Sequence, residues 1–596
     1  MCAGLTTTKA VAIVIIVAII VAAGTYELSS SRITPSGATT TVTMGGSSTS
    51  SPSVPNGGTI VMEETATPDT IDPAVAYDYS EEAVQLVYQG LMVFSTNSTN
   101  PVVPYIAESY NISADGLTYN FQIRNNITFS NGDPVNAYVF WYSIYRSAIM
   151  AQPPSSLISA ALNTTGVTAD QLNTYNSTTP PANLLTIMEN PNNAITVTGP
   201  YSLQFHLMSA YSAFLATLTQ PQSSAVDPVV VSAHGGVVAG QPNSWMTVNG
   251  VGTGPWLISV TPGVETDYKK NPTYWGGTPV FESTPHLDEV VCKAVPDTLT
   301  RLEDLEHGSA QLALVDFGVT PQVVGQSGLY FPNIGGQMGV NFVGMDVWKF
   351  PLNNILIREA VAHAINETAI LPIWRGFAQQ YVGPIPKGVL GYNNNLQPYS
   401  YNLTLAKQLL AQAGYPNGQG LPTLVFVYAT DVSPETEVSE VIQANLAAIG
   451  LKVSLRGETS GVEITTLDSM RNPADPSHPD LMWNNWAWFP DPWAFSDWFL
   501  GPLDYGASNV AWYNNTQVLN LISKADATTN QTLRAELYEN ASAIAYNDYP
   551  YIYLAQQKGS LEEGVPVSSI NLQGFRPAPE MLGIELSDLY LIPSSG

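Results

Sequence analysis

A strand–helix–strand unit constrains the fold of this 596-residue chain more than any other feature of its sequence. Residues 423–429 (TLVFVYA) are apolar and rich in β-forming side chains, and 451–455 (LKVSL) predict a second strand. Between them, one helix face is marked by Val438, Val441, Ile442, Leu446 and Ile449. Two strands joined by a helix of this length run parallel, so the unit predicts an α/β fold.

Other segments add strands and helices of the same mixed kind. The pattern predicts strands at 59–62 and 117–123, a helix at 357–365 capped by Asn353 or Asn354, and a helix at 404–413 that ends at Gly414. A chain this long exceeds what one hydrophobic core supports, so two or three domains are expected.

The charge balance excludes one class of partner. The chain has 48 Asp+Glu against 20 Lys+Arg, a formal net charge of −28, yet only 11% of its residues are charged. Nucleic-acid binding requires clustered Lys and Arg, which this composition does not supply. With 45% hydrophobic residues the chain can also bury cores, which argues against general disorder.

The N-terminus is typical of an export signal. Residues 10–23 are apolar and follow Lys9. They are fewer than the roughly 20 apolar residues that a membrane-spanning helix needs, and their length is typical of the apolar part of a signal peptide. The arrangement resembles archaeal pilin-like leaders, with cleavage expected between Lys9 and Ala10. An uncleaved anchor is the alternative, and both place the rest of the chain outside the cell.

We therefore assign residues 1–28 to a signal or membrane segment and residues 29–58, rich in Ser, Thr, Pro and Gly, to a tether. Ten N-x-S/T sequons support an exported glycoprotein, at Asn97, Asn111, Asn126, Asn163, Asn176, Asn366, Asn402, Asn514, Asn530 and Asn540. If the leader is cut, Cys2 is lost and Cys292 is expected to be a buried, unpaired residue.

The common catalytic signatures are missing from the sequence. It has no G-x-S-x-G elbow, no Walker loop and no H-E-x-x-H motif. His286, Asp288 and Glu289 lie close together, but their spacing does not require a metal. These absences argue against metalloenzymes, nucleotide hydrolases and serine hydrolases of the common kinds without excluding every enzyme. Our expectation is no enzyme activity, no metal and no cofactor.

The segment 483–498 (WNNWAWFPDPWAFSDW) holds five of the 12 Trp residues of the chain. For any single Trp, burial in a core is the simpler interpretation. Pro490 and Pro492, however, interrupt helices and central strands, so we predict a loop, and loops often carry binding residues. Trp faces with nearby Asn and Asp suit an uncharged polyol such as a sugar. The candidate ligand-binding residues are Trp483, Asn485, Trp486, Trp488, Asp491, Trp493 and, near the start of the body, Tyr77.

Several motifs, in order along the chain, resemble family 5 of the solute-binding proteins of ABC importers, the dipeptide/oligopeptide class. They include the block PYIAESYNISADGLTYNFQIRNNITFSNGDPVNA, then GTGPWLI, NPTYWGG, LNNILIREAVAHAINETAI, YNLTLAKQLLAQAGYPNG and the Trp486 to Pro492 stretch. The resemblance covers residues 58 to 596. It implies an extracellular binding component that traps its ligand between two lobes and delivers it to a membrane permease.

The family fold implied by this resemblance is a two-lobed periplasmic-binding-protein-like fold of class II, with an extra subdomain and a hinge. Carried over, lobe I comprises residues 58–339 plus 551–596, and lobe II comprises residues 340–550. The protein would work at the extracellular face of the cell membrane, held there by its N-terminal segment.

The ligand expected from the sequence is an oligosaccharide of the cellobiose or maltose type, in preference to an oligopeptide. Peptide binders of the family commonly hold the ligand amine with an Asp three residues before the acidic residue of a D-P pair. Here the pair is Asp491-Pro492, and Trp488 stands at the amine position. An ammonium group without a counter-charge is costly to bury, which disfavours a free peptide N-terminus.

Two other functional classes remain open from the sequence. An extracellular glycoside hydrolase would need two carboxylates across a sugar bond, and Asp480, Asp491 and Asp497 are available. A structural cell-surface glycoprotein would fit the leader and the tether. The scarcity of Lys and Arg also suggests strongly acidic surroundings, because few cations limit self-repulsion once the carboxylates are protonated.

Overall fold

We describe the protein from a computed structural model that covers residues 54–592 with short gaps. The gaps are 77–78, 96–101, 279–283, 335–338, 431, 433, 488, 503–504, 560–563 and 577–583. The predicted leader, and the tether before residue 54, lie outside the described residues. Within the described part, every helix is too short or too polar to cross a membrane.

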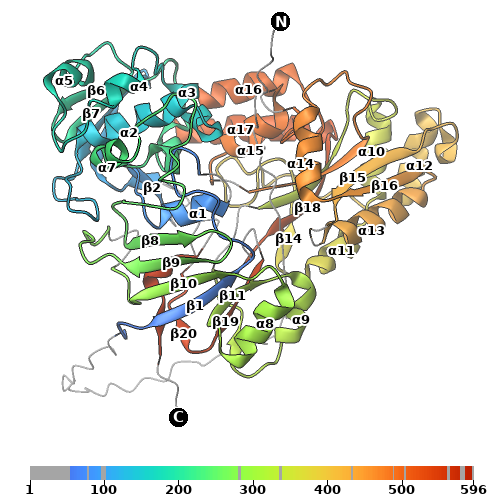
Figure 1. Cartoon of the computed structure of the whole chain (residues 1–596). Helices are drawn as coiled ribbons and strands as arrows, with labels where there is room; N and C mark the ends of the chain where they lie inside the picture. Colours follow the sequence, from blue (N-terminus) through green and yellow to red (C-terminus); the bar gives the residue numbers. More distant parts are fainter. Residues whose placement is uncertain are drawn as a thin grey trace, which may run out of the picture.

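The first large sheet has seven strands and belongs to the first lobe (Figure 1). Its strands, in spatial order, are β12 (Leu329–Tyr330), β19 (Val565–Ser569), β11 (Leu312–Val315), β1 (Thr59–Glu64), β10 (Glu289–Ala294), β9 (Glu265–Lys270) and β8 (Trp256–Thr261). The central strand β1 pairs in parallel with both β10 and β11. The same lobe contains three helices: α1 (Tyr79–Gln85), α8 (Thr298–His307) and α9 (Thr320–Val323).

The second large sheet has six strands and belongs to the second lobe. Its order is β14 (Ala378–Gln380), β18 (Tyr551–Gln557), β13 (Val340–Met345), β17 (Leu481–Trp486), β15 (Leu424–Ala429) and β16 (Val453–Glu458). Its helices are α10 (Ile355–Ala364), α11 (Glu367–Ile370), α12 (Leu403–Gln412), α13 (Glu435–Ala447), α14 (Ser460–Ser469), α15 (Trp493–Leu500), α16 (Thr516–Asp526) and α17 (Gln531–Asn547).

A smaller antiparallel sheet with its own helices forms an extra subdomain beside the first sheet (Figure 1). Its strands are β4 (Ala107–Ile112), β5 (Thr118–Ile123), β7 (Ser202–His206) and β6 (Ile195–Gly199). The helices are α2 (Ala137–Met150), α3 (Ser156–Ala161), α4 (Ala169–Leu172), α5 (Ala182–Met188), α6 (Phe214–Thr217) and α7 (Pro228–Ala233). Two short pairs complete the strands: β2 (Met92–Phe94) with β3 (Val102–Pro104), and β20 (Leu572–Gln573) with β21 (Tyr590–Leu591).

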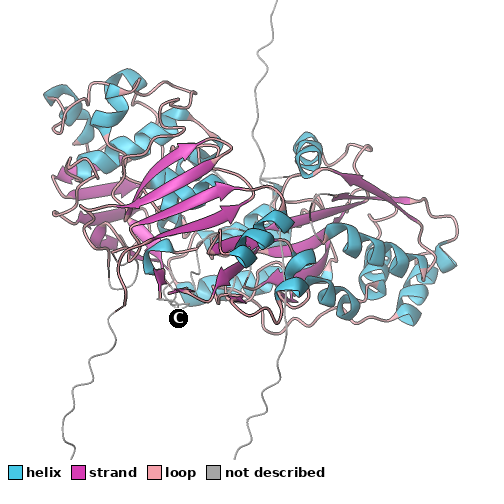
Figure 2. Cartoon of the chain, turned by 60° about the horizontal axis from the view of Figure 1, so that its bottom comes forward, coloured by secondary structure: helices cyan, strands magenta, loops and turns pink. Residues whose placement is uncertain are grey.

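The chain passes between the two large sheets twice, and Figure 2 shows the two lobes side by side. The first passage lies between β12 and β13, and the second between β18 and β19. The two passages touch, because the Gln557 amide donates to the Gly339 carbonyl at 2.8 Å. The predicted boundary at residue 550 differs from the strand pairing, which places β18 in the second sheet beside β13. The return to the first sheet therefore lies between Gln557 and Val565.

Most of the elements expected from the sequence are present. The parallel unit is confirmed, because β15 and β16 pair in parallel around α13. Asn354, one of the two expected caps, accepts from the Leu356 amide and begins α10, and α12 ends just before Gly414 with its φ of 95°. Cys292 is buried on β10, as expected.

Candidate functional site

The Trp-rich segment is mostly regular structure, so the predicted loop over 483–498 is wrong. Its first residues complete strand β17, in the middle of the second sheet, and its last residues form helix α15. Of the described residues in this segment, 487 and 489–492 lie outside both elements. Both prolines lie among them, and Pro492 is the residue that precedes the first turn of α15. The prolines therefore end the strand and begin the helix without interrupting either one.

The two Trp side chains of β17 point to opposite faces of the sheet, as alternate positions of a strand dictate. Trp483 is fully buried and stacks on Trp374, with ring centroids 6.4 Å apart. Trp486 is buried on the other face, and its Nε1 donates to the Ala494 carbonyl at 3.0 Å. Both side chains therefore contribute to hydrophobic cores in this conformation.

Asp491 forms a buried ion pair with Arg534 of α17. The two guanidinium nitrogens donate to the two carboxylate oxygens at 2.7 and 2.8 Å. Asp491 Oδ1 also accepts from the amide of Trp493 at 2.9 Å, at the start of α15. Because both oxygens are engaged inside the protein, Asp491 braces the β17–α15 connection against α17.

A pair of carboxyl groups lies beside this ion pair. Burial raises the pKa of Asp526 to about 6, and it raises that of Asp497, which Asp526 also repels, well above its ordinary value. The Tyr538 hydroxyl donates to Asp526. Two like charges this close and this buried favour a protonated carboxyl at mildly acidic pH.

The first lobe touches the second at this connection. Phe94 of β2 stacks on Phe489, with centroids 6.0 Å apart, and Tyr211 meets Trp493 edge to face at 5.8 Å. The Ser212 amide donates to the Asp526 carbonyl at 2.7 Å. Side chains from both lobes share one core here, so the two lobes are in contact at this connection.

A second group of polar side chains lies at the end of the second sheet nearest the passages between lobes. Asn341 of β13 stands opposite Asn485 of β17, so their side chains lie on one face. Asn485 Nδ2 donates to Glu435 Oε1 at 3.3 Å, and Glu435 Oε2 accepts from the Ala429 amide at 2.8 Å. All three side chains are at most 2% exposed.

This polar group has unused hydrogen-bonding capacity. Asn341 Nδ2 and Asn485 Oδ1 are buried and make no hydrogen bond with the described residues. Such groups are costly to bury, and in binding proteins they are often completed by a ligand. Sequence reasoning selected Asn485 but missed Asn341 and Glu435. No predicted element adjoined Asn341, and the only signal for Glu435 was its position just before the helix face that begins at Val438.

Two predicted site residues, Trp488 and Tyr77, lie outside the described residues. Trp493 is buried against Phe489, with centroids 6.2 Å apart. Trp483 and Asn485 thus lie on one face of β17, whereas Trp486 and Trp493 belong to the core on the other face. Among the described residues, no group of three or more His, Cys, Asp or Glu could hold a metal ion.

Comparison with protein families gives one match over most of the chain. The family described as bacterial extracellular solute-binding proteins, family 5 Middle, matches residues 101–507. Among curated proteins, the chain is similar to the glutathione-binding protein GsiB of Escherichia coli O1:K1. The two are 27% identical over 532 residues, which cover 86% of this chain and 90% of GsiB.

Solved structures share the fold. The periplasmic binding protein DppA of Helicobacter pylori, in complex with the peptide STSA, is 24% identical with a TM-score of 0.67, covering 90% of this chain and 98% of DppA. The oligopeptide-binding protein AppA of Bacillus subtilis, in complex with a nonapeptide, is 18% identical with a TM-score of 0.68, covering 91% and 100%. These likenesses confirm the two-lobed mixed α/β fold.

Proposed function

Because the chain belongs to family 5 of the bacterial extracellular solute-binding proteins, we propose that it captures a short peptide between its two lobes for import. Proteins of this family are the solute-binding components of ABC importers and are not enzymes. They work outside the cytoplasm, in the periplasm or at the cell exterior. The ATPase and the permease are separate chains, which agrees with the missing Walker loop.

The comparisons do not support the oligosaccharide predicted from the Trp-rich segment. GsiB is described as glutathione-binding, and DppA and AppA were solved with peptides. In addition, the faces of Trp483 and Trp486 are packed in cores and are not available to stack on a sugar ring. A peptide is therefore the ligand class that we propose.

The observation that carries the proposal is the pair of amide groups at Asn341 and Asn485. A free amide N–H and a free amide C=O on one face match the alternating C=O and N–H groups of an extended peptide. Both lie in the second lobe at the end of its sheet nearest the passages. A ligand there contacts the hinge, so its binding is coupled to closure.

Glu435 supplies the negative charge that the sequence appeared to lack. The family's amine-binding position holds Trp488. The buried Glu435 carboxylate is hydrogen-bonded to Asn485, which lies three residues before Trp488. We propose that this carboxylate receives the ammonium group of the peptide. Its bonds to Asn485 and to the Ala429 amide would hold it in place for that contact.

The lobe boundaries that we propose follow the strand pairing. The first lobe comprises residues from 58 to the first passage together with the C-terminal residues after the second, and the second lobe extends from β13 to the end of β18. We further propose that the apolar N-terminal segment and the tether hold the protein at the cell surface. Washing whole cells at high salt tests this, because an anchored protein stays with the membrane fraction.

A melting-temperature screen of the purified chain tests the proposed ligand class. A ligand that binds the folded state raises the melting temperature in proportion to the logarithm of its concentration. We expect a rise with di- to pentapeptides, and none with cello- or malto-oligosaccharides. Analysis of the same samples for cleavage products separates binding from hydrolysis. A rise with sugars alone would overturn the proposal.

A further inference from the structure

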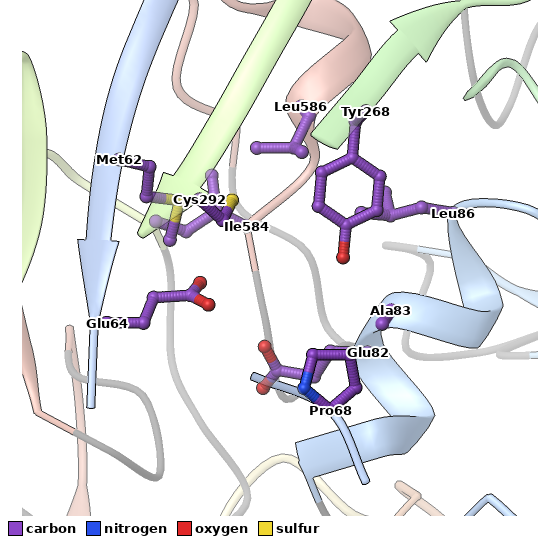
Figure 3. Close-up of a pocket in the computed structure, with 10 residues that line it drawn as sticks. All are labelled: Met62, Glu64, Pro68, Glu82, Ala83, Leu86, Tyr268, Cys292, Ile584 and Leu586. Atoms are coloured by element: carbon purple, nitrogen blue, oxygen red, sulfur yellow. The ribbon is translucent and has the colours of Figure 1, made fainter. Parts of the chain in front are cut away.

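Polar side chains of the first lobe differ in how far a modifying enzyme can reach them. The carboxylates of Glu64 and Glu82 point inward, into a pocket between the first large sheet and helix α1 (Figure 3). The asparagines of the N-x-S/T sequons stand at the surface instead, on both lobes. Of the nine that the structure describes, all except Asn366 are exposed, so exposure alone does not distinguish one sequon from another.

Five of the described sequons are tied into helices or strands. Three of their asparagines are the N-caps of α11, α12 and α17, namely Asn366, Asn402 and Asn530. Asn540 lies inside α17, where the hydroxyl-bearing residue of its sequon, Ser542, is buried, and Asn111 lies in strand β4. A transferase must hold the Asn-x-Ser/Thr backbone itself, so modification at these positions would first have to break backbone hydrogen bonds of the element.

Two loop sequons are restrained by their middle residue. At Asn126 the middle residue is Ile127, which is only 2% exposed. At Asn514 it is Asn515, which caps α16. Neither segment can be drawn out to an enzyme without moving a core residue or a helix cap. The described sequons that remain on exposed loops are those of Asn163 and Asn176.

The loop that carries Asn163 joins α3 to α4 and is short and exposed. Leu162 and Val167 are buried at its two ends, and Asn163, Thr165 and Gly166 are exposed between them. The exposed part of the loop makes no backbone-to-backbone hydrogen bond with the described part of the chain. Gly166 has a φ of 95°, and a Cβ there would meet open space. An enzyme can therefore hold this loop without disrupting the fold.

Thr165 sets the conformation of the Asn163 side chain. The Thr165 hydroxyl donates to Asn163 Oδ1 at 2.6 Å, and the Thr165 amide donates to the same atom at 3.2 Å, which closes an Asx turn. Both bonds engage Oδ1, so Nδ2, the atom to which an N-linked sugar is attached, takes part in neither. At Asn176 the hydroxyl of Ser177 donates instead to the Thr179 carbonyl at 2.7 Å. Among the described sequons, Asn163 is the one whose own Ser or Thr hydroxyl bonds the asparagine side chain.

We propose that Asn163 is modified by N-glycosylation, with Thr165 as its positioning residue. The sugar comes from a glycosyl phosphate donor. The bond from Nδ2 to the sugar C1 forms, the bond from C1 to the phosphate oxygen breaks and leaves its electron pair on that oxygen, and Nδ2 loses one proton. The hydroxyl bonded to Oδ1 withdraws electron density from the amide, which helps Nδ2 to give up that proton.

The location of the family supports this modification. Proteins of this family work outside the cytoplasm, and N-x-S/T sequons in surface loops of exported proteins are glycan acceptors. The loop between α3 and α4 shares no residue with the Asn341, Asn485 and Glu435 group. The modification is therefore independent of the proposed peptide site.

Glycopeptide mass spectrometry of the full-length chain, purified from the cells that make it, tests this proposal. We expect a glycan on Asn163 in most copies and a several-fold lower occupancy at Asn176. Thr165→Ser keeps the hydroxyl and should keep the glycan, whereas Asn163→Gln and Thr165→Val should lose it. The matched control, Thr404→Val, removes the sequon of Asn402 without removing its helix cap and should leave the glycan mass of the chain unchanged.

The competing explanation is that exposure alone decides which sequon is modified. Under it, Asn176 carries a glycan as often as Asn163, and that result would overturn the proposal, as would an unmodified Asn163. Gly166→Val separates the turn from the sequon, because it keeps Asn-x-Thr but places a β-branched residue at a positive φ. We expect a several-fold loss of glycan in this variant, and unchanged occupancy would also overturn the proposal. Melting shifts with peptides should be the same in Asn163→Gln as in the parent, which keeps this test separate from that of the peptide site.

Discussion

The buried ion pair between Asp491 and Arg534 gives a sharp test of how the Trp-rich connection is held. In Arg534→Met the apolar stem is retained, and Asp491 is left inside the protein without its counter-charge. The side chains of the pair are 11% and 3% exposed, and two hydrogen bonds of 2.7 and 2.8 Å join them. Removing one partner of such a pair costs about 3–5 kcal/mol in the free energy of unfolding.

Urea denaturation at pH 7, followed by Trp fluorescence, measures this change. The double variant Asp491→Asn with Arg534→Met should recover most of the loss, because the asparagine oxygen still accepts from the Trp493 amide. Arg456→Met is the control, since its pair with Glu458 is 41% exposed on the arginine side and is worth at most about 1 kcal/mol. A loss below about 1 kcal/mol in Arg534→Met, or a double variant no better than the single, would refute the reasoning.

Three further predictions concern the peptide site, pH and chain packing. Glu435→Gln should weaken binding of a peptide with a free N-terminal amine at least tenfold in calorimetry, and should hardly change binding of the N-acetylated peptide. The control is Glu437→Gln, at an exposed position, which should change neither affinity. Because burial raises the folded-state pKa of Asp526 to about 6, its stabilising contribution is complete below pH 3.8 and is lost as pH rises through 6. Melting curves from pH 3 to 8 should show this decline, and Asp526→Asn should flatten it. Gly252→Ala should destabilise the fold by more than about 2 kcal/mol in urea denaturation, because the added Cβ would lie 1.9 Å from the Val87 carbonyl oxygen. Gly461→Ala, in helix α14 with open space around it, should be neutral or stabilising in the same assay.

The parts of the fold that could be predicted are those with local signals. Helix α10 has apolar residues at helical spacing and a cap at Asn354 that bonds two residues ahead. The parallel β15–β16 unit is likewise local, contained within residues 424–458, and a glycine, Gly450, follows its helix. In each case the sequence pattern and the physical contact lie close together in the chain.

The Trp-rich segment could not be predicted in the same way, because its polar residues have distant partners. Asn484 donates to the Ala507 carbonyl and Asn485 to Glu435, so both amides can be buried in a central strand. From sequence alone, the run WNNW has the polarity of a loop. The same reason hid Asn341 and Glu435, whose position beside Asn485 depends on contacts between residues far apart in the chain.

The oligosaccharide prediction, which the comparisons do not support, rested on an assumption of the same kind. Trp488 at the amine-binding position implied that no carboxylate was available, whereas the structure places the Glu435 carboxylate beside Asn485 from another element. A count of charges along one motif does not reveal a charge that the fold brings to it.

Equilibrium dialysis of the purified chain against a mixture of di- to pentapeptides and cello- and malto-oligosaccharides tests the central claim most directly. Mass spectrometry of the protein chamber identifies what has accumulated. The account predicts peptides with a free N-terminus, at about one per chain, and their loss in Glu435→Gln. Accumulation of sugars with no enrichment of any peptide would contradict it.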